Sequence, residues 1–314
     1  MPGKRWRRPT WAVGTGSMVA MDLLRHLSFF VAVAEEGHFG NAASRLGMTQ
    51  PPLSQGVRRL EQRLGAELVQ RSARGVGLTD AGRQLLPRAR LLVADAARFE
   101  DEAHRIAGGR DAVVRWGVPH SVADGVVVRC VRALRDADET RPTRVVTTTA
   151  PTTELVDAVR TGSLDVAVVE HPALLTGLDS GPVLKLRRWV VVPDDHPAAV
   201  AKKAQVRMLR GLALAIGPRS DNPPAHDLFV DLWRVRGLDP DIVIAPGPRE
   251  ILTHVAAGGH FGVTATAPTV MPGVTWVDLL REDLALRLRI VWRSGADVAP
   301  SAAALDRVLL RADR

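Results

Sequence analysis

The sequence predicts an α/β protein with a winged helix-turn-helix in its first third, then one long helix, then a larger region of strands and helices. Three observations support this prediction. Residues 41–61 have the spacing of two short helices joined by a turn, residues 85–106 carry a heptad repeat, and β-rich runs alternate with helical patterns from residue 111 onward. A length of 314 residues suits two or three folding units.

Residues 41–61, NAASRLGMTQPPLSQGVRRLE, predict the helix-turn-helix. Gly47 supplies the sharp turn, and the hydroxyl of Thr49 can cap the second helix. The first helix has a compact inner face made of Ala42, Ala43 and Leu46. In the second helix, apolar residues at steps of four, three and four predict one buried stripe, formed by Leu53, Val57, Leu60 and Leu64.

The opposite face of the second helix is polar. Its side chains have the donors and acceptors that read base edges in a major groove, and they are Gln50, Ser54, Gln55 and Arg58. Pro51 stands in the first turn, where a helix tolerates proline. Taken alone, this pattern also fits helical hairpins that touch no DNA. Charge favours DNA binding, because residues 1–110 hold 17 basic and 10 acidic side chains, whereas residues 111–314 hold 25 and 24.

Residues 64–82 predict a β-hairpin wing, since two short apolar segments flank the stretch from Arg71 to Gly75. Arginines at such a tip can lie along the DNA backbone or enter the minor groove. Arg71 and Arg74 are therefore candidates for phosphate or minor-groove contacts. The alternative is a solvated loop with arginines.

Many residues between Met21 and Pro87 match the order and spacing of one family. They are Phe29, Phe30, Val33, Glu35–Gly37, Phe39, Ala42, Ala43, Leu46, Gln50, Pro51, Leu53, Ser54, Arg58–Glu61, Leu64, Gly65, Leu68, Arg71, Leu78, Thr79, Ala81 and Gly82. On these residues the segment resembles the amino-terminal domain of LysR-type transcriptional regulators. The resemblance implies four groove-facing residues, Gln50, Pro51, Ser54 and Gln55. It also implies three residues that hold the DNA backbone, Thr49, Arg58 and Arg71.

The segment departs from the family pattern at several positions. Gly56 lies inside the recognition helix, where relatives usually have a larger side chain, at a cost of about 1 kcal/mol in helix preference. Pro52 replaces a common alanine or serine. With Pro51 it removes two backbone donors from the first turn, so we expect this helix entry to dock differently. Three further departures are His38 for serine, Val69 for phenylalanine, and Gln55 at a position that is often basic.

The next predicted helix carries a heptad repeat of alternating large and small residues. The predicted seam comprises Leu85, Ala89, Leu92, Ala96, Phe99, Ala103 and Ile106. We expect a cap at Thr79 or Asp80, a bend or restart at Pro87, and an end at Gly108-Gly109. The alternative is a helix packed on its own domain. Dimerisation through the seam is favoured, agrees with the family's linker helix, and would present two recognition helices to a pseudo-palindromic operator.

From residue 111 the sequence predicts a parallel sheet covered by helices. The expected strands are Val113–Val118, Arg144–Thr149, Val166–Val169, Trp189–Val192, Leu212–Ile216, Ile242–Ala245, Phe261–Thr264 and Leu286–Trp292. Three stretches resemble the LysR effector domain, namely Glu154-Leu155, Gly162–Ala167 and Asp194–Pro197. The resemblance implies a two-lobed, periplasmic-binding-protein-like fold. One lobe would span about 111–187 and 270–314, the other about 188–269, with two strand crossovers as the hinge.

In such a fold a ligand lies between the lobes, held by strand-end loops and helix amino termini. The corresponding loops contain His120-Ser121, Thr149–Thr153, Glu170-His171, Arg219–Asn222 and Thr264–Thr266. Seven residues are selected as effector contacts, namely His120, Ser121, Thr149, Thr152, Arg219, Ser220 and Thr264. Hydroxyls and an arginine near helix starts would suit a small anionic ligand such as a carboxylate. The alternative is that several of them are simple caps and turn residues.

The remaining composition argues against other kinds of site. Cys130 is the only cysteine, so no intrachain disulfide can form, and we expect it on a helix with its side chain in the protein core. The nine histidines lack metal-ligand spacing, and even His254 and His260 straddle Gly258-Gly259, so we expect neither a metal nor a cofactor. No catalytic motif is present, so we do not expect an enzyme. No apolar run approaches the roughly 20 residues that span a bilayer.

Residues 1–20 resemble no domain, and are expected to be a disordered basic arm or to precede a true start at Met18 or Met21. The other expected divisions are 21–79 for the winged helix-turn-helix, 80–109 for the linker helix and 110–314 for the effector domain. The sequence thus predicts a bacterial cytoplasmic transcription factor, dimeric or tetrameric. Its partners would be double-stranded DNA, a small-molecule effector and RNA polymerase as a further candidate. The alternative is an α/β ligand-binding or catalytic protein whose helical amino terminus serves only assembly.

Overall fold

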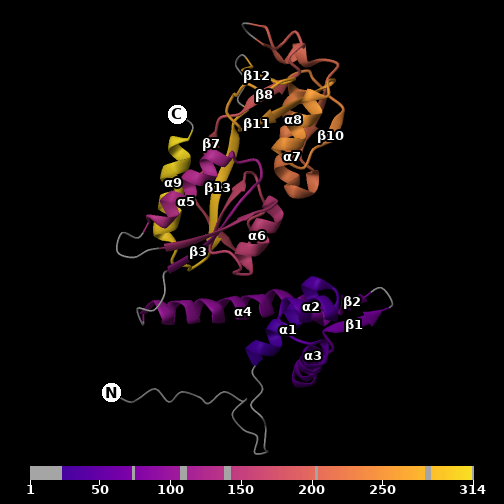
Figure 1. Cartoon of the computed structure of the whole chain (residues 1–314), viewed down its shortest axis with the longest axis vertical. Helices are drawn as coiled ribbons and strands as arrows, with labels where there is room; N and C mark the ends of the chain where they lie inside the picture. Colours follow the sequence, from indigo (N-terminus) through magenta and orange to yellow (C-terminus); the bar gives the residue numbers. More distant parts are fainter. Residues whose placement is uncertain are drawn as a thin grey trace, which may run out of the picture. The chain divides into compact units, whose positions relative to one another are not determined.

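The computed structural model describes residues 23–72, 75–106, 112–137, 143–201, 204–279 and 284–312 (Figure 1). These form two compact units that divide at Val93 and Ala94, within helix α4. The predicted amino-terminal arm (1–20), Arg74 and the helix end at Gly108-Gly109 lie outside the described residues.

The first unit confirms the winged helix-turn-helix. Its elements in chain order are α1 (Leu23–Glu36), α2 (Phe39–Arg45), α3 (Gln50–Leu64), the antiparallel hairpin β1 (Val69–Ser72) and β2 (Gly75–Leu78), and the start of α4 (Asp80–Ile106). Leu53, Val57 and Leu60 of α3 are buried as expected. The prediction that Leu46 and Leu64 face the core is wrong, because these side chains are 37% and 45% exposed. Each stands at the end of its helix, where the chain turns away from the neighbouring helices.

Gly56 is buried where α3 packs against α1. A Cβ atom there would lie 2.4 Å from Cδ2 of Phe29 and 3.0 Å from Cδ2 of His26. The missing side chain therefore lets α1 approach α3, and this packing offsets the lower helix preference of glycine.

Helix α4 begins as expected. The hydroxyl of Thr79 accepts a bond from the Gly82 N–H (2.9 Å) and donates to the Glu67 carbonyl (2.6 Å). The helix runs through Pro87 to Ile106.

The two sections of the predicted α4 seam differ in exposure. Ala89 is buried in the core of the DNA-binding unit, and Leu85 packs against that core, so these two positions follow the alternative of packing on their own domain. Leu92 and Phe99 are 50% and 75% exposed, and Ala96 is partly buried. The surface left for a partner therefore begins at Leu92.

The second unit has two lobes, each built on one sheet. Lobe 1 has the strand order β4-β3-β5-β13-β6, with β7 also paired to β13. Its strands are β3 (Ala112–Val118), β4 (Thr143–Thr149), β5 (Val166–Glu170), β6 (Leu178–Ser180), β7 (Leu184–Leu186) and β13 (Leu286–Arg293). The expectation of a parallel sheet is wrong in part, because β3 is parallel to β4 and β5 whereas β13 runs antiparallel to its neighbours.

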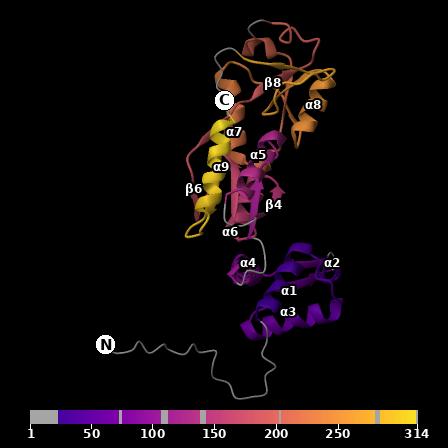
Figure 2. The same cartoon turned by 60° about the vertical axis from the view of Figure 1, so that its left-hand side comes forward.

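Alternation along β5 shows how the lobe 1 sheet is covered. Val166 and Val168 face the core shared with α5 (Asp124–Arg135) and α9 (Ala299–Arg311), and Ala167 and Val169 face α6 (Thr152–Arg160). Figures 1 and 2 show α5 and α9 side by side on one face of the sheet. Burial on both faces explains why this strand reads as a continuous apolar run.

Lobe 2 has the strand order β10-β9-β11-β8-β12. Its elements are β8 (Trp189–Val192), β9 (Ala213–Ile216), β10 (Ile242–Ile244), β11 (His260–Thr264), β12 (Thr275–Val277), α7 (Pro223–Val235) and α8 (Pro248–Ala256). Because β12 pairs with β8, the crossover back to lobe 1 falls after β12 rather than at about residue 270 as the sequence suggested.

Candidate DNA-binding surface and effector cavity

The polar residues predicted to read DNA lie opposite the buried stripe of α3. Gln50, Pro51, Gln55 and Arg58 are exposed, and Ser54 is partly buried. Since Leu53, Val57 and Leu60 anchor the other side of the helix, this polar face is available to a major groove.

Thr49 does not cap α3 with its side chain. It occupies the N-cap position with extended backbone, but its hydroxyl makes no cap bond. A capping hydroxyl bonds to the N–H of the second or third helical residue, and in α3 these are Pro51 and Pro52, which have none. The hydroxyl of this exposed residue therefore keeps its hydrogen-bonding capacity for another acceptor or donor.

The wing is fixed to the recognition helix by Glu61. Its carboxylate accepts bonds from the N–H groups of Leu68 (2.8 Å) and Val69 (3.1 Å). The sequence matched Glu61 to the family without assigning this role. Glu61 therefore holds the start of β1, where Val69 pairs with Leu78. Arg71 lies two residues further along β1, opposite Val76.

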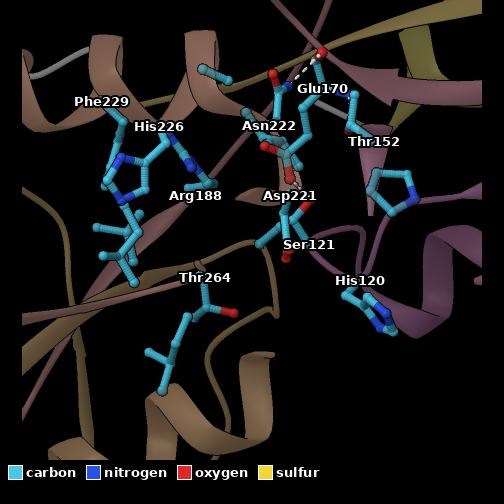
Figure 3. Close-up of a pocket in the computed structure, with 18 of the residues that line it drawn as sticks. His120, Ser121, Thr152, Glu170, Arg188, Asp221, Asn222, His226, Phe229 and Thr264 are labelled. Atoms are coloured by element: carbon cyan, nitrogen blue, oxygen red, sulfur yellow. Dashed lines mark hydrogen bonds between the residues drawn. The ribbon is translucent and has the colours of Figure 1, made fainter. Parts of the chain in front are cut away.

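A cavity of about 410 Å³ lies between the two lobes of the second unit. Lobe 1 contributes the loop after β3, the start of α6 and the end of β5. Lobe 2 contributes residues 215–218, α7 as far as Arg236, the turn before α8 and the end of β11. Figure 3 shows polar side chains of both lobes around this space. Position and size suit a small molecule.

Four of the seven selected effector residues line this cavity, namely His120, Ser121, Thr152 and Thr264. Thr149, Arg219 and Ser220 do not. Arg219 instead makes two bonds to Asp227, Nε to Oδ1 at 2.7 Å and a terminal nitrogen to Oδ2 at 2.6 Å. The hydrogen bond from Arg219 lowers the pKa of Asp227 to about 2.

Glu170, at the end of β5, forms hydrogen bonds with residues of both lobes. The Ser121 hydroxyl donates to its carboxylate, and its backbone N–H donates to the Thr152 hydroxyl (3.1 Å). Its carbonyl accepts from Nδ2 of the buried Asn222 (3.1 Å), so this bond joins lobe 1 to lobe 2 (Figure 3). Glu170 and Asn222 lie in loops that the sequence predicts to hold the ligand, but neither is among the seven predicted effector contacts. A polar residue ending the apolar strand β5 was the available signal.

The other side of the cavity combines aromatic and basic groups. Nε of Arg188 donates to the Leu284 carbonyl (2.5 Å), and its guanidinium carbon lies 4.6 Å from the centre of the Phe229 ring. Nε2 of His226 is buried with no hydrogen-bond partner in the described part of the chain. Burial is the main cause that raises the pKa of Asp221, and also the main cause that lowers the pKa of His171.

Within the described ranges, no helix is long and apolar enough to cross a membrane, and no three His, Cys, Asp or Glu side chains are grouped to hold a metal ion. Cys130 is buried as expected, and burial raises the pKa of its thiol to about 12.

A helix-turn-helix joined to a two-lobed domain with an interlobe cavity defines a class of DNA-binding regulators with an effector domain. Residues 24–83 match the bacterial regulatory helix-turn-helix protein, lysR family, and residues 107–314 match the LysR substrate binding domain. The chain belongs to the LysR family and is a DNA-binding transcriptional regulator with an effector-binding domain.

Similar proteins cover most of the chain. The HTH-type transcriptional regulator ShiR of Corynebacterium glutamicum (strain R) is 32% identical over 298 residues, covering 91% of this chain and 98% of ShiR. A "Probable hydrogen peroxide-inducible genes activator" of Mycobacterium xenopi is 37% identical over 174 residues, 55% of this chain and 91% of that protein. Full-length CbnR complexed with its target DNA shares the fold, with a TM-score of 0.68 at 22% identity over 92% of this chain and 99% of that chain.

Proposed function

We propose that this regulator binds a pseudo-palindromic operator as a dimer or tetramer, and that a small molecule in the interlobe cavity changes how it holds promoter DNA. The observation that carries the proposal is the cavity itself, to which both lobes supply polar groups and across which Asn222 bonds to Glu170. A ligand there would alter a contact that joins the lobes, and hence their relative position.

Contacts between lobe 1 and the carboxy-terminal part of α4 support a route from the cavity to the linker helix. Arg98 donates to the Gly162 carbonyl (2.9 Å), and Arg293 of β13 pairs with Asp95 at 3.0 Å. Since β13 pairs with β5, the strand that ends at Glu170, a shift in the cavity would be transmitted to this part of α4.

Self-association is proposed through the exposed part of the α4 seam, from Leu92 to Phe99.

We further propose that the protein acts in the bacterial cytoplasm, that it does not catalyse a reaction, and that RNA polymerase is its protein partner at the promoter. The roles of Gln50, Ser54, Gln55 and Arg58 as base or backbone contacts belong to the same proposal, as do Thr49, Pro51, Arg71 and Arg74.

A gel-shift titration with DNA upstream of the chain's own gene tests DNA recognition. We expect sequence-specific binding that weakens steeply as salt rises, because phosphate contacts release counterions. Ser54→Ala should reduce discrimination between operators, whereas Arg71→Ala should weaken binding to all DNA and flatten the salt dependence. Equal effects of the two changes on specificity would contradict these roles.

A further inference from the structure

Two carboxylates line the cavity without an ion-pair partner among the described residues, those of Glu170 in lobe 1 and Asp221 in lobe 2. The Glu170 side chain accepts a bond from the Ser121 hydroxyl, and Asp221 is hydrogen-bonded by Ser220. Both contacts come from neutral hydroxyls, so no direct ion pair neutralises either carboxylate, while the cavity lining also includes Arg188, Arg236 and Arg287. Figure 3 shows Glu170 and Asp221 near Ser121, with Arg188 and Phe229 further to the left.

Several basic groups around the same cavity have other contacts. Arg188 donates to the Leu284 carbonyl and lies over the Phe229 ring, and Arg236 donates to the Leu232 carbonyl (2.9 Å). The cavity residue Asp231 is paired with Arg234 at 3.2 Å. Arg219, which was expected to bind an anion, is held by Asp227 outside the cavity lining.

A carboxylate without an ion-pair partner in a confined space is costly, since desolvation disfavours its charged form. Burial does raise the pKa of Asp221, and Glu154 adds to that effect while His120 opposes it. A positively charged ligand group would remove this cost, whereas an anion would increase it.

We propose that the effector carries a protonated amine, bound by the carboxylates of Glu170 and Asp221. This inference rests on the proposed function, in which the cavity binds the effector. The apolar lining formed by Ile216, Phe229, Ile251 and Val263 would hold a hydrocarbon or aromatic part of the same molecule. The amine could belong to a simple amine or to an amino acid, and the two share the ammonium group that this site recognises.

Thermal unfolding of the full chain with matched probes tests the proposal. One series shares a phenylethyl group and comprises 2-phenylethylamine, L-phenylalanine and 3-phenylpropanoate. A second, linear series comprises pentylamine, norleucine and hexanoate. We expect an increase in Tm from amine-bearing members of at least one series, and none from the carboxylic acids. Stabilisation by amines alone identifies a simple amine, and stabilisation by amino acids as well indicates that the carboxylate is also accepted.

Isosteric variants show whether the carboxylates are responsible. Glu170→Gln and Asp221→Asn should each weaken binding of the stabilising amine about tenfold or more, because each removes a charge-assisted hydrogen bond. Glu250→Gln removes a negative charge from an exposed position of α8 that does not line the cavity, and should leave the affinity unchanged.

Three results would overturn the inference. They are stabilisation by the acids only, unchanged amine affinity in both cavity variants, and stabilisation by no member of either series. If an acid stabilises the chain and also changes its binding to promoter DNA, the proposed function stands and only the amine inference fails.

Discussion

Gly56 and Phe29 pack so closely that any side chain at residue 56 would overlap the aromatic ring, since an added Cβ atom would lie 2.4 Å from Cδ2. The recognition helix is held against α1 at this point. Its orientation therefore depends on a position where the sequence alone indicated only a weaker helix.

Gly56→Ala should destabilise the DNA-binding unit. Alanine would contribute about 1 kcal/mol of helix preference, but overpacking against Phe29 costs about 1–3 kcal/mol, so we expect a net loss. Hydrogen exchange of the α1 and α3 amides measures this. The control is Gly125→Ala in α5, where a Cβ atom meets nothing within 4 Å and no loss is expected. Equal protection of α1 and α3 in wild type and Gly56→Ala would contradict the packing argument.

Two threonines at helix starts should differ in their effect on stability. Thr79→Ala removes a cap that bonds both Gly82 and Glu67, and should cost about 1 kcal/mol. Thr49→Ala removes a hydroxyl without a cap bond, so it should leave the free energy of unfolding nearly unchanged and affect DNA binding instead. Chemical denaturation and gel shifts of the two variants distinguish these outcomes, and a large stability loss for Thr49→Ala would contradict the conclusion that its hydroxyl does not stabilise the fold.

Cys130 should make the fold sensitive to alkaline pH. Its pKa is raised from 9.0 to about 12 in the folded chain, so the unfolded chain loses the thiol proton first as pH rises. The stabilising contribution is therefore complete below about pH 9 and is lost between pH 9 and 12. The chain has no tyrosine to titrate in that range. In Tm measurements from pH 8 to 11, Cys130→Ala should show a smaller decline than wild type, and parallel curves would refute the assignment.

Phe99 should contribute to self-association. It is 75% exposed on α4, and replacing it with serine should shift the chain toward monomer at a concentration where wild type is associated. Leu174→Ser is the control, because Leu174 is 79% exposed but belongs to the loop between β5 and β6 rather than to α4. Sedimentation velocity gives the readout. Dissociation of both variants, or of neither, would locate the interface elsewhere.

The sequence predicted the larger elements well, because their periodicity survives in the packing. All eight expected strands are present within one residue of their predicted ends, whereas β6, β7 and β12, of three residues each, were missed. Runs such as LDS at 178–180 are too short for a period to show, and they become strands only because β13 supplies a pairing edge.

The candidate sites were predicted less evenly. The polar face of α3 follows from helical spacing, so its exposure could be expected. Arg219 was selected because it stands near a helix start, but Asp227, eight residues later, takes its guanidinium, and that choice depends on the local fold. Glu170 is recognisable in the sequence as a polar residue at the end of an apolar strand, but its hydrogen bonds to Ser121 and Asn222, which lie far from it in the sequence, could not be predicted.

The most direct test of a ligand-controlled switch is a DNase footprint of the full chain on DNA upstream of its own gene, with and without a compound that raises its Tm. We expect the compound to change the length or internal pattern of the protected region. Asn222→Ala, which removes the bond to Glu170 between the lobes, should weaken that change while specific binding persists. An unchanged footprint at saturating compound would contradict the coupling of cavity and recognition helix.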